Sequence, residues 1–343
     1  MPTRDLIAME ARQEAELPRE PGWQFEPKWD GFRCLARRED DKVELIGRSG
    51  KSLARYFPDV VAGLQALKPK RFMLDGELVI PIGKVLSFDA LQMRLHPAAS
   101  RVTRLAAEQP ALFIAFDMLE TARGAHVADK PLADRRTALE QFFDKLGTAP
   151  VLRLSPATER RAEAEKWLAR AGGGELDGVV AKRLDEPYRA GERAMVKVKH
   201  LRSADCVVGG FRYVSSGEPL VGSLLLGLFN AEGKLDHVGF TSGFSAEDRQ
   251  ALTSKVEALR GGTGFTGDAP GGPSRWSTER SAQWERLKLS LVAEVQYDHV
   301  TGDRFRHATR FLRWRPDKPP RQCTFDQLRQ ESVPSRLIDL RHV

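Results

Sequence analysis

The sequence predicts an α+β protein of two domains. Its 343 residues suit two domains, because single domains mostly span roughly 100–200 residues. Apolar periodicity predicts mixed strands and helices up to about residue 202 and mostly strands beyond it. We therefore expect a charged lead-in at residues 1–22, with room for one short helix, a mixed domain at residues 23–202 and a β-rich domain at residues 203–343.

The elements of the mixed domain follow from short apolar and β-branched runs between turn residues. Residues 32–38 and 43–48 predict a hairpin that turns at Asp40 and Asp41. The run 111–118 is almost continuously apolar, which indicates a buried strand. Further strands are expected at residues 72–80, 176–183 and 195–200, and helices at residues 133–143 and 159–171.

Five strands and one helix are expected in the β-rich domain. The strand candidates are residues 205–214, 223–230, 235–241, 291–299 and 305–313. The helix covers residues 245–259, and Ser245 is placed to cap its first turn. This content predicts a small barrel of the OB type, with an SH3-like barrel or a small sandwich as the alternatives.

The composition is basic. Lys plus Arg is 54 and Asp plus Glu is 47, which gives a formal net charge of +7 and a pI near 9.4. A basic surface favours a polyanionic partner, and nucleic acid is the commonest such partner. A solvated cationic surface would have the same composition, so charge alone favours nucleic acid only weakly.

Cysteine usage and hydropathy predict a cytoplasmic protein that does not enter a membrane. Cys34, Cys206 and Cys323 lie far apart and form no CxxC pair, which indicates neither a disulfide framework nor a cysteine-based zinc site. The first residues contain no apolar core of a secretory signal, and the longest nearly apolar stretch, residues 220–229, is too short to span a bilayer.

The pattern K-x-D-G-x-R is the first candidate site, with Lys28, Asp30, Gly31 and Arg33 at its fixed positions. An unprotonated lysine amine can attack phosphorus and form a phosphoramidate. The aspartate and arginine can hold a sugar or phosphate, while the glycine permits a tight turn between them. Asp-Gly is also an ordinary turn dipeptide, so this pattern needs companions before it indicates catalysis.

Companion motifs follow in order. They are GRSGKSL at residues 47–53, LDGELVI at 74–80, FIAFDML at 113–119, LDGVVAKR at 176–183, MVKVKHL at 195–201 and RFLRWRPDKPP at 310–320. The series resembles the covalent nucleotidyltransferase superfamily of DNA ligases, RNA ligases and mRNA capping enzymes. The resemblance implies a nucleotidyltransferase (adenylation) domain with ATP-grasp-like antiparallel sheets and helices, followed by an OB-fold β-barrel.

The resemblance also implies a role for each matched residue. Lys28 corresponds to the adenylylated lysine, and Phe116, rather than Phe113, corresponds to the aromatic that stacks on adenine. Lys182 is expected to face the nucleotide phosphates or solvent. The implied nucleotide-binding residues are Glu26 (adenine amine), Lys28, Asp30, Arg33, Arg48, Glu77, Phe116, and Lys197 and Lys199 on the α-phosphate.

Metal and pyrophosphate positions follow from the same resemblance. Glu77 and Asp177 are the implied ligands of Mg²⁺ or Mn²⁺; many ligases have glutamate at the second position, so the shorter aspartate would hold the metal closer to its strand. Arg315, Asp317 and Lys318 form an R-x-D-K motif that orients pyrophosphate in the first catalytic step. This motif favours DNA ligases within the superfamily.

The predicted function is an ATP-dependent DNA ligase that seals 3′-hydroxyl/5′-phosphate nicks through lysyl-AMP, in DNA repair. The chain is most similar in organisation to the small two-domain bacterial repair ligases of the C type. ATP, nicked duplex DNA and DNA end-binding or repair proteins are the expected partners, and we expect a monomer. An RNA ligase or capping guanylyltransferase is the nearest alternative, and a non-catalytic OB-fold nucleic-acid-binding protein is an alternative of another class.

Overall fold

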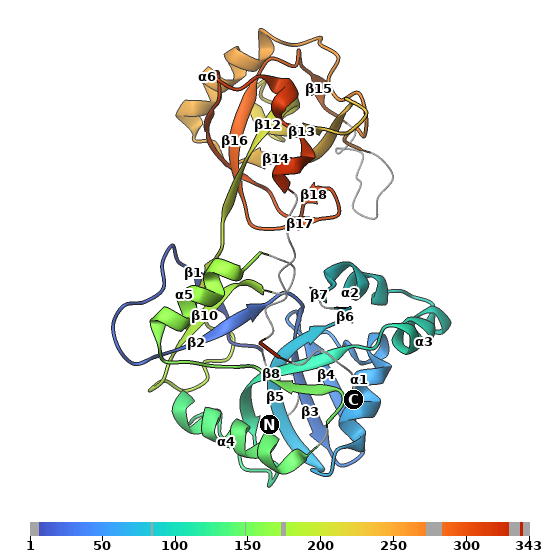
Figure 1. The fold of residues 1–343 in the computed structure, drawn as a ribbon, viewed down its shortest axis with the longest axis vertical. Coiled ribbons are helices and arrows are strands. Elements are labelled where there is room, and N and C mark those ends of the chain that lie inside the picture. The colour runs from blue at the N-terminus through green and yellow to red at the C-terminus, as the bar shows by residue number, and fades with distance from the viewer. Residues whose placement is uncertain are drawn as a thin grey trace. The chain divides into compact units, whose positions relative to one another are not determined.

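The computed structural model describes residues 7–83, 85–147, 149–172, 176–271, 283–328 and 337–338, which divide into two compact units (Figure 1). The first unit runs to His200, and the second begins at Leu201. Leu337 and Ile338 pack against a core of the first unit, although the sequence groups residues 203–343 in one domain. Residues 329–336 and 339–343 of that predicted domain lie outside the described residues.

A five-stranded sheet forms one layer of the first unit, in the order β4-β3-β5-β8-β9. Its strands are β3 (Phe32–Glu39), β4 (Lys42–Gly47), β5 (Arg71–Val79), β8 (Leu112–Glu120) and β9 (Leu152–Leu154). The predicted hairpin is confirmed as β3 and β4, and Asp40 has φ 53° in the turn. Every residue of β8 is buried, as its continuous apolar run predicts.

A four-stranded sheet forms the second layer, in the order β1-β11-β10-β2. It consists of β1 (Ala11–Gln13), β2 (Trp23–Trp29), β10 (Leu176–Arg183) and β11 (Met195–Lys199). The sequence left room for a short helix in the lead-in, but the described lead-in residues contain strand β1 instead, which pairs in parallel with β11. The hydrogen bonds of β1 join segments that are far apart in the chain, and local periodicity does not predict such pairing. Side chains of β2, β5, β8 and β10 belong to one hydrophobic cluster, which also includes residues of α5.

Helices cover the outer faces of these sheets. The predicted helices are confirmed as α4 (Leu132–Leu146), which packs on β8, and α5 (Arg161–Arg170), which packs on β2 and β10. Sequence periodicity missed three shorter helices: α1 (Pro58–Ala66), α2 (Phe88–Arg94) and α3 (Ala99–Glu108). The remaining short elements of this unit are η2 (Ala54–Tyr56), β6 (Pro81–Ile82) and β7 (Val85–Leu86).

The second unit contains a sheet in the order β14-β13-β12-β16-β19, with β15 paired to β12. Helix α6 (Ala246–Glu257) begins after Ser245, whose hydroxyl accepts a hydrogen bond from the Asp248 amide, as predicted. The strands are β12 (Arg202–Tyr213), β13 (Val221–Phe229), β14 (Leu235–Ser242), β15 (Glu285–Arg286), β16 (Val292–Tyr297) and β19 (Arg310–Trp314). The unit also has β17 (Val300–Thr301), β18 (Arg304–Phe305), η3 (Pro320–Gln322) and η4 (Phe325–Leu328).

The strand predicted at residues 305–313 is confirmed only in part, because the structure has two short strands there. Its first part is β18, which pairs with β17, and its second part is β19, which pairs with β16. The two parts therefore hydrogen-bond to different partners. A bridge between Thr241 and Thr309 joins the segments at the two edges of the larger sheet. None of the described helices in either unit is long and apolar enough to span a bilayer.

Candidate active site

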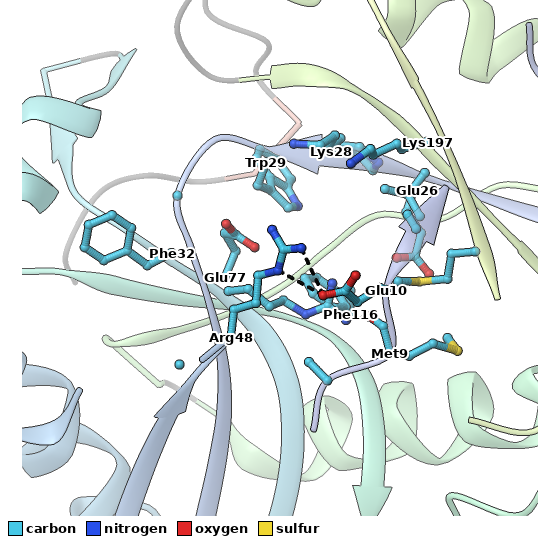
Figure 2. A pocket seen from close by; sticks show the side chains of 18 of the residues that line it. Met9, Glu10, Glu26, Lys28, Trp29, Phe32, Arg48, Glu77, Phe116 and Lys197 are labelled. Atoms are coloured by element: carbon cyan, nitrogen blue, oxygen red, sulfur yellow. Dashed lines mark hydrogen bonds and ion pairs between the residues drawn. The ribbon is translucent and has the colours of Figure 1, made fainter. Parts of the chain in front are cut away.

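A pocket of about 650 Å³ opens between the two sheets of the first unit (Figure 2). Strand β2 supplies one side of it, and β5 and β8 of the other sheet supply the opposite side. The predicted nucleotide-binding residues that line it are Glu26, Lys28, Arg33, Arg48, Glu77, Phe116 and Lys197. Asp30, Asp177 and Lys199 are outside this lining. Asp177 nevertheless contacts Lys28, and Lys199 contacts Asp177. Motifs that are far apart in the sequence therefore meet in one cavity.

Lys28 lies at the end of β2, where a bulge in the neighbouring strand brings a carboxylate to it. The pairing of β2 with β10 shifts register between Leu176 and Gly178, so Asp177 lies in the irregularity. Such bulges redirect side chains. The Asp177 Oδ2 atom lies 2.6 Å from Lys28 Nζ and 3.2 Å from Lys199 Nζ. We call Lys28, Asp177 and Lys199 the ion triad.

The ion triad is part of a predominantly cationic region. Burial alone would raise the pKa of Asp177, but Lys28 and Lys199 hold it below its ordinary value. Burial lowers the pKa of Lys197, and the nearby cations, including Arg48, lower it further. Figure 2 shows Lys28 and Lys197 beside one another at the pocket. Fixed cations of this kind favour an anionic ligand and stabilise negative charge that develops on it.

An aromatic ring forms part of the pocket surface. Phe116 on β8 lines the cavity, whereas Phe113, on the same strand, is fully buried in the core, as expected. The Arg33 guanidinium lies 4.6 Å from the Phe116 ring centroid, and Lys182 Nζ lies 4.7 Å from it. Such contacts are favourable, because the ring face is electronegative. They fix the position of the aromatic ring inside the pocket.

Arg33 is held by a buried network that the motif spacing did not predict. Both guanidinium contacts to Asp75 are 2.6 Å, and the Asp75 side chain has no exposed surface. Tyr188 donates a hydrogen bond of 2.5 Å to the same carboxylate and accepts one of 2.9 Å from the Met9 amide. Burial and the Asp75 carboxylate raise the pKa of Tyr188. The lead-in thus reaches the site through Met9.

Arg48 also contacts the lead-in. Its guanidinium lies 2.9 Å from Glu10, the interaction drawn as dashed lines in Figure 2. The hydrogen bond from Arg48 holds the pKa of Glu10 below its ordinary value. Arg48 is 71% exposed and Glu10 is 27% exposed, so solvent weakens this pair. Arg48 can therefore exchange its partner for a phosphate at little cost.

Of the two orientations expected for Lys182, the structure contradicts the one towards solvent. Its side chain lines the pocket but is only 3% exposed, and its Nζ lies 2.8 Å from Glu26. Glu26 and Gln24 belong to β2, which pairs with the strand that carries Lys182. A buried cation requires a paired anion, and Glu26 provides it.

Glu77 suits a divalent cation, although the described residues include no group of three or more typical metal ligands. Burial raises the pKa of Glu77 to about 8, although Arg33 and Lys28 act in the opposite direction. A nearby cation stabilises a buried carboxylate, and Mg²⁺ prefers oxygen ligands. Both lysine contacts to Asp177 involve its Oδ2 atom.

We expect Glu77→Gln to remove a pH dependence of folding stability. Well below pH 4.5, the ordinary pKa of a glutamate, the Glu77 carboxyl is protonated in both the folded and the unfolded protein. Between pH 4.5 and about 8 it releases its proton only in the unfolded protein. The free energy of unfolding of the unmodified protein should therefore fall through this window, relative to the variant. Urea titrations without nucleotide or metal measure the difference, and parallel curves for the two proteins would contradict it.

The R-x-D-K motif forms a separate ion network in the second unit. Arg315 lies 3.0 Å from Asp205 on β12 and 2.8 Å from Asp317. The hydrogen bond from Arg315 lowers the pKa of Asp317 to about 2. The Lys318 amide donates to the Arg315 carbonyl oxygen and closes the turn. Asp205 was not predicted from the sequence, because it precedes Arg315 by 110 residues.

Comparison with known proteins identifies the class. The profile described as "ATP dependent DNA ligase domain" matches residues 8–199, and that described as "ATP dependent DNA ligase C terminal region" matches residues 217–318. The chain therefore belongs to the family of ATP-dependent DNA ligases. It is similar to bacterial DNA ligase C: it is 44% identical to DNA ligase C1 of Mycolicibacterium smegmatis, over 93% of this chain and 92% of that protein.

Other relatives agree with this assignment. DNA ligase C of Mycobacterium tuberculosis is 40% identical over 93% of this chain and 92% of that protein. A multifunctional non-homologous end joining protein LigD from Pseudomonas aeruginosa is 30% identical over 94% of this chain but 37% of that protein. A Lig E DNA ligase structure has the same fold, with a TM-score of 0.57, 19% identity and coverage of 90% and 100% of the two chains. The predicted resemblance to C-type ligases is confirmed.

Proposed function

We propose that this ATP-dependent DNA ligase seals 3′-hydroxyl/5′-phosphate nicks in duplex DNA through AMP bound covalently to Lys28. The ion triad carries this proposal. The Lys28 amine lies 2.6 Å from Asp177, Lys199 lies 3.2 Å from the same oxygen, and both the amine and the Phe116 ring line the pocket. An amine, fixed cations and an aromatic surface are what a nucleotide needs for attack at its α-phosphate.

The proposed reaction has three phosphoryl transfers. Lys28 Nζ bonds to the α-phosphorus of ATP, and pyrophosphate departs. AMP then passes to the 5′-phosphate at the nick, and the 3′-hydroxyl finally displaces AMP. Asp177 orients the amine, while Lys197 and Lys199 neutralise charge on the transferred phosphate. Mg²⁺ or Mn²⁺, held by Glu77 and Asp177, would supply additional charge neutralisation when bound.

We further propose that the second unit is an OB-fold barrel whose Arg315, Asp317 and Lys318 orient pyrophosphate in the first step. The bridge between Thr241 and Thr309 supports closure, because it links the two edge regions of the sheet. DNA binding should depend on phosphate contacts and show no sequence preference. The logarithm of its affinity should fall with log salt by about 0.9 per phosphate neutralised.

A role in DNA repair, with DNA end-binding proteins as partners, extends this proposal. It is supported by relatives that are described as multifunctional non-homologous end joining proteins. The protein is proposed to act as a monomer in the bacterial cytoplasm, on the nucleoid. The measurement that bears on this is co-sedimentation with purified end-binding protein, in the presence and absence of linear duplex DNA.

Labelling with α-³²P-ATP followed by a chase with unlabelled nicked duplex DNA tests the central proposal. Label should appear on the protein, leave it when nicked DNA is added, and emerge as free AMP as the nick is sealed. Mass spectrometry should place AMP on Lys28. Label from GTP instead of ATP would support a capping enzyme, and sealing of nicked RNA alone would support an RNA ligase.

A further inference from the structure

We propose that Lys182 is a positioning residue for base selection: it keeps Glu26 ionised and fixed, so that this carboxylate accepts a hydrogen bond from the 6-amino group of adenine. The proposal rests on the proposed function and on the role that the resemblance implies for Glu26, which is contact with the adenine amine. In this role Lys182 does not act on the reacting phosphate. It helps to determine which nucleotide the pocket accepts.

Glu26 has its two carboxylate oxygens held by different donors. Gln24 Nε2 donates to Oε1 over 2.7 Å, and Lys182 Nζ lies 2.8 Å from Oε2. In the pairing of β2 with β10, Lys182 lies opposite Gln24 and Val180 lies opposite Glu26. Glu26 and Lys182 both line the pocket, although each side chain is only 3% exposed. The carboxylate is therefore rigid and nearly dry at the point where it faces the cavity.

The charge of Lys182 is matched mainly by Glu26. Its other carboxylate neighbour, Asp117, is 3.9 Å away and is already bound by Arg135 through contacts of 2.8 and 3.0 Å. A buried carboxylate is stable as an anion only when it is paired. Without Lys182, Glu26 would keep one neutral donor, Gln24, and its Oε2 atom would lose the ion pair that holds it.

The protonation state of Glu26 decides what it recognises. An ionised carboxylate only accepts hydrogen bonds, whereas a protonated carboxyl also donates one. The 6-amino group of adenine donates, but the 6-oxo group of guanine only accepts. An ionised Glu26 therefore favours adenine and leaves guanine with two facing acceptors. Sites that bind a ligand donor can reject analogues that lack it by large factors, because a buried polar group is then left unpaired.

The test measures self-adenylylation by Lys182→Met with ATP, GTP and purine riboside triphosphate, which lacks the 6-amino group. The unmodified protein should prefer ATP to the purine analogue by roughly 10–100-fold in kcat/KM. In the variant this ratio should fall about tenfold or more, because Glu26 is no longer held in place as a hydrogen-bond acceptor for the amino group. A folded variant with an unchanged ratio would overturn the proposal.

Arg183→Met is the matched control. It removes the cation next to Lys182 on β10, which is 30% exposed and pairs with Asp185 and not with Glu26. It should leave the ratio of ATP to analogue unchanged. Where Lys182→Met does not fold, Gln24→Leu removes the other hydrogen bond to Glu26 without leaving a buried charge unpaired; its ratio should fall less, and an unchanged ratio would count against the proposal. Absence of labelling in the unmodified protein would instead refute the proposed function.

Discussion

Lys28→Ala is expected to abolish self-adenylylation and ATP-dependent sealing of nicked DNA. The substitution removes the only atom proposed to bond to the α-phosphorus, and water in its place would produce no stored intermediate. Loss of a covalent nucleophile typically lowers turnover by roughly 10⁴-fold or more. Quench-flow measurement of labelled protein after mixing with ATP and magnesium gives the rate directly.

Two controls separate chemistry from folding. Sealing of a nick that already carries AMP on its 5′-phosphate should survive in Lys28→Ala, because that final step uses the DNA hydroxyl as nucleophile. Lys70→Ala should behave as the unmodified protein, since Lys70 is 61% exposed and contacts only the surface residue Asp41 among the described ion pairs. Retention of full ATP-dependent sealing by Lys28→Ala would exclude the lysyl-AMP route.

Local sequence patterns predicted the central strands, and the resemblance to the nucleotidyltransferase superfamily implied which residues meet in the pocket. The K-x-D-G-x-R pattern places Lys28 at the end of β2 and Arg33 within β3, so a short spacing carries both to one cavity. Alternation predicted that Lys197 and Lys199 share one strand face, which agrees with their common proximity to Lys28. Strand periodicity and turn chemistry act over a few residues, so the strands themselves were predictable from short stretches of sequence.

Features that depend on distant pairing were not predictable from the chain alone. Tyr188 reaches Asp75 across 113 residues, and Met9 reaches Tyr188 across 179. The strand at β1 forms because β11 supplies its hydrogen-bond partners, not because its own residues favour it. Lys182 is a similar case: its burial depends on Glu26 in the neighbouring strand, whereas a lysine in isolation is expected in solvent.

Two of the missed helices, α1 and α2, have a related explanation. Helix α1 buries only Val60 and Leu64, and α2 spans seven residues, so neither shows a long apolar stripe in the sequence. Arg94 on α2 is instead held by Asp59 of α1 over 2.8 Å. Short helices of this kind are stabilised by tertiary contacts rather than by intrinsic propensity. Their positions therefore become visible only when the packed domain is known.

Asp75→Asn is expected to destabilise the protein by about 3–5 kcal/mol and to weaken nucleotide binding, because it breaks a buried ion pair by removing one partner. Asp75 makes two contacts of 2.6 Å to Arg33 and accepts from Tyr188, so the substitution leaves the guanidinium without its counter-ion. Arg33 would no longer be held over Phe116. Urea unfolding measures the first effect, and the KM for ATP in self-adenylylation measures the second.

Tyr188→Phe and Asp41→Asn separate the parts of this effect. The first removes only the hydroxyl that bonds to Asp75 and to the Met9 amide, so it should cost about 1 kcal/mol and raise the KM less. Asp41 is 98% exposed in its ion pair with Lys70, and its substitution should change neither quantity. If Asp75→Asn lost stability but kept the KM for ATP, Asp75 would support the fold without orienting Arg33 towards the nucleotide. A rise in KM for both Tyr188→Phe and Asp75→Asn, larger for the variant that removes the ion pair, would assign the network to nucleotide binding, since a purely structural effect would appear in the unfolding curve alone.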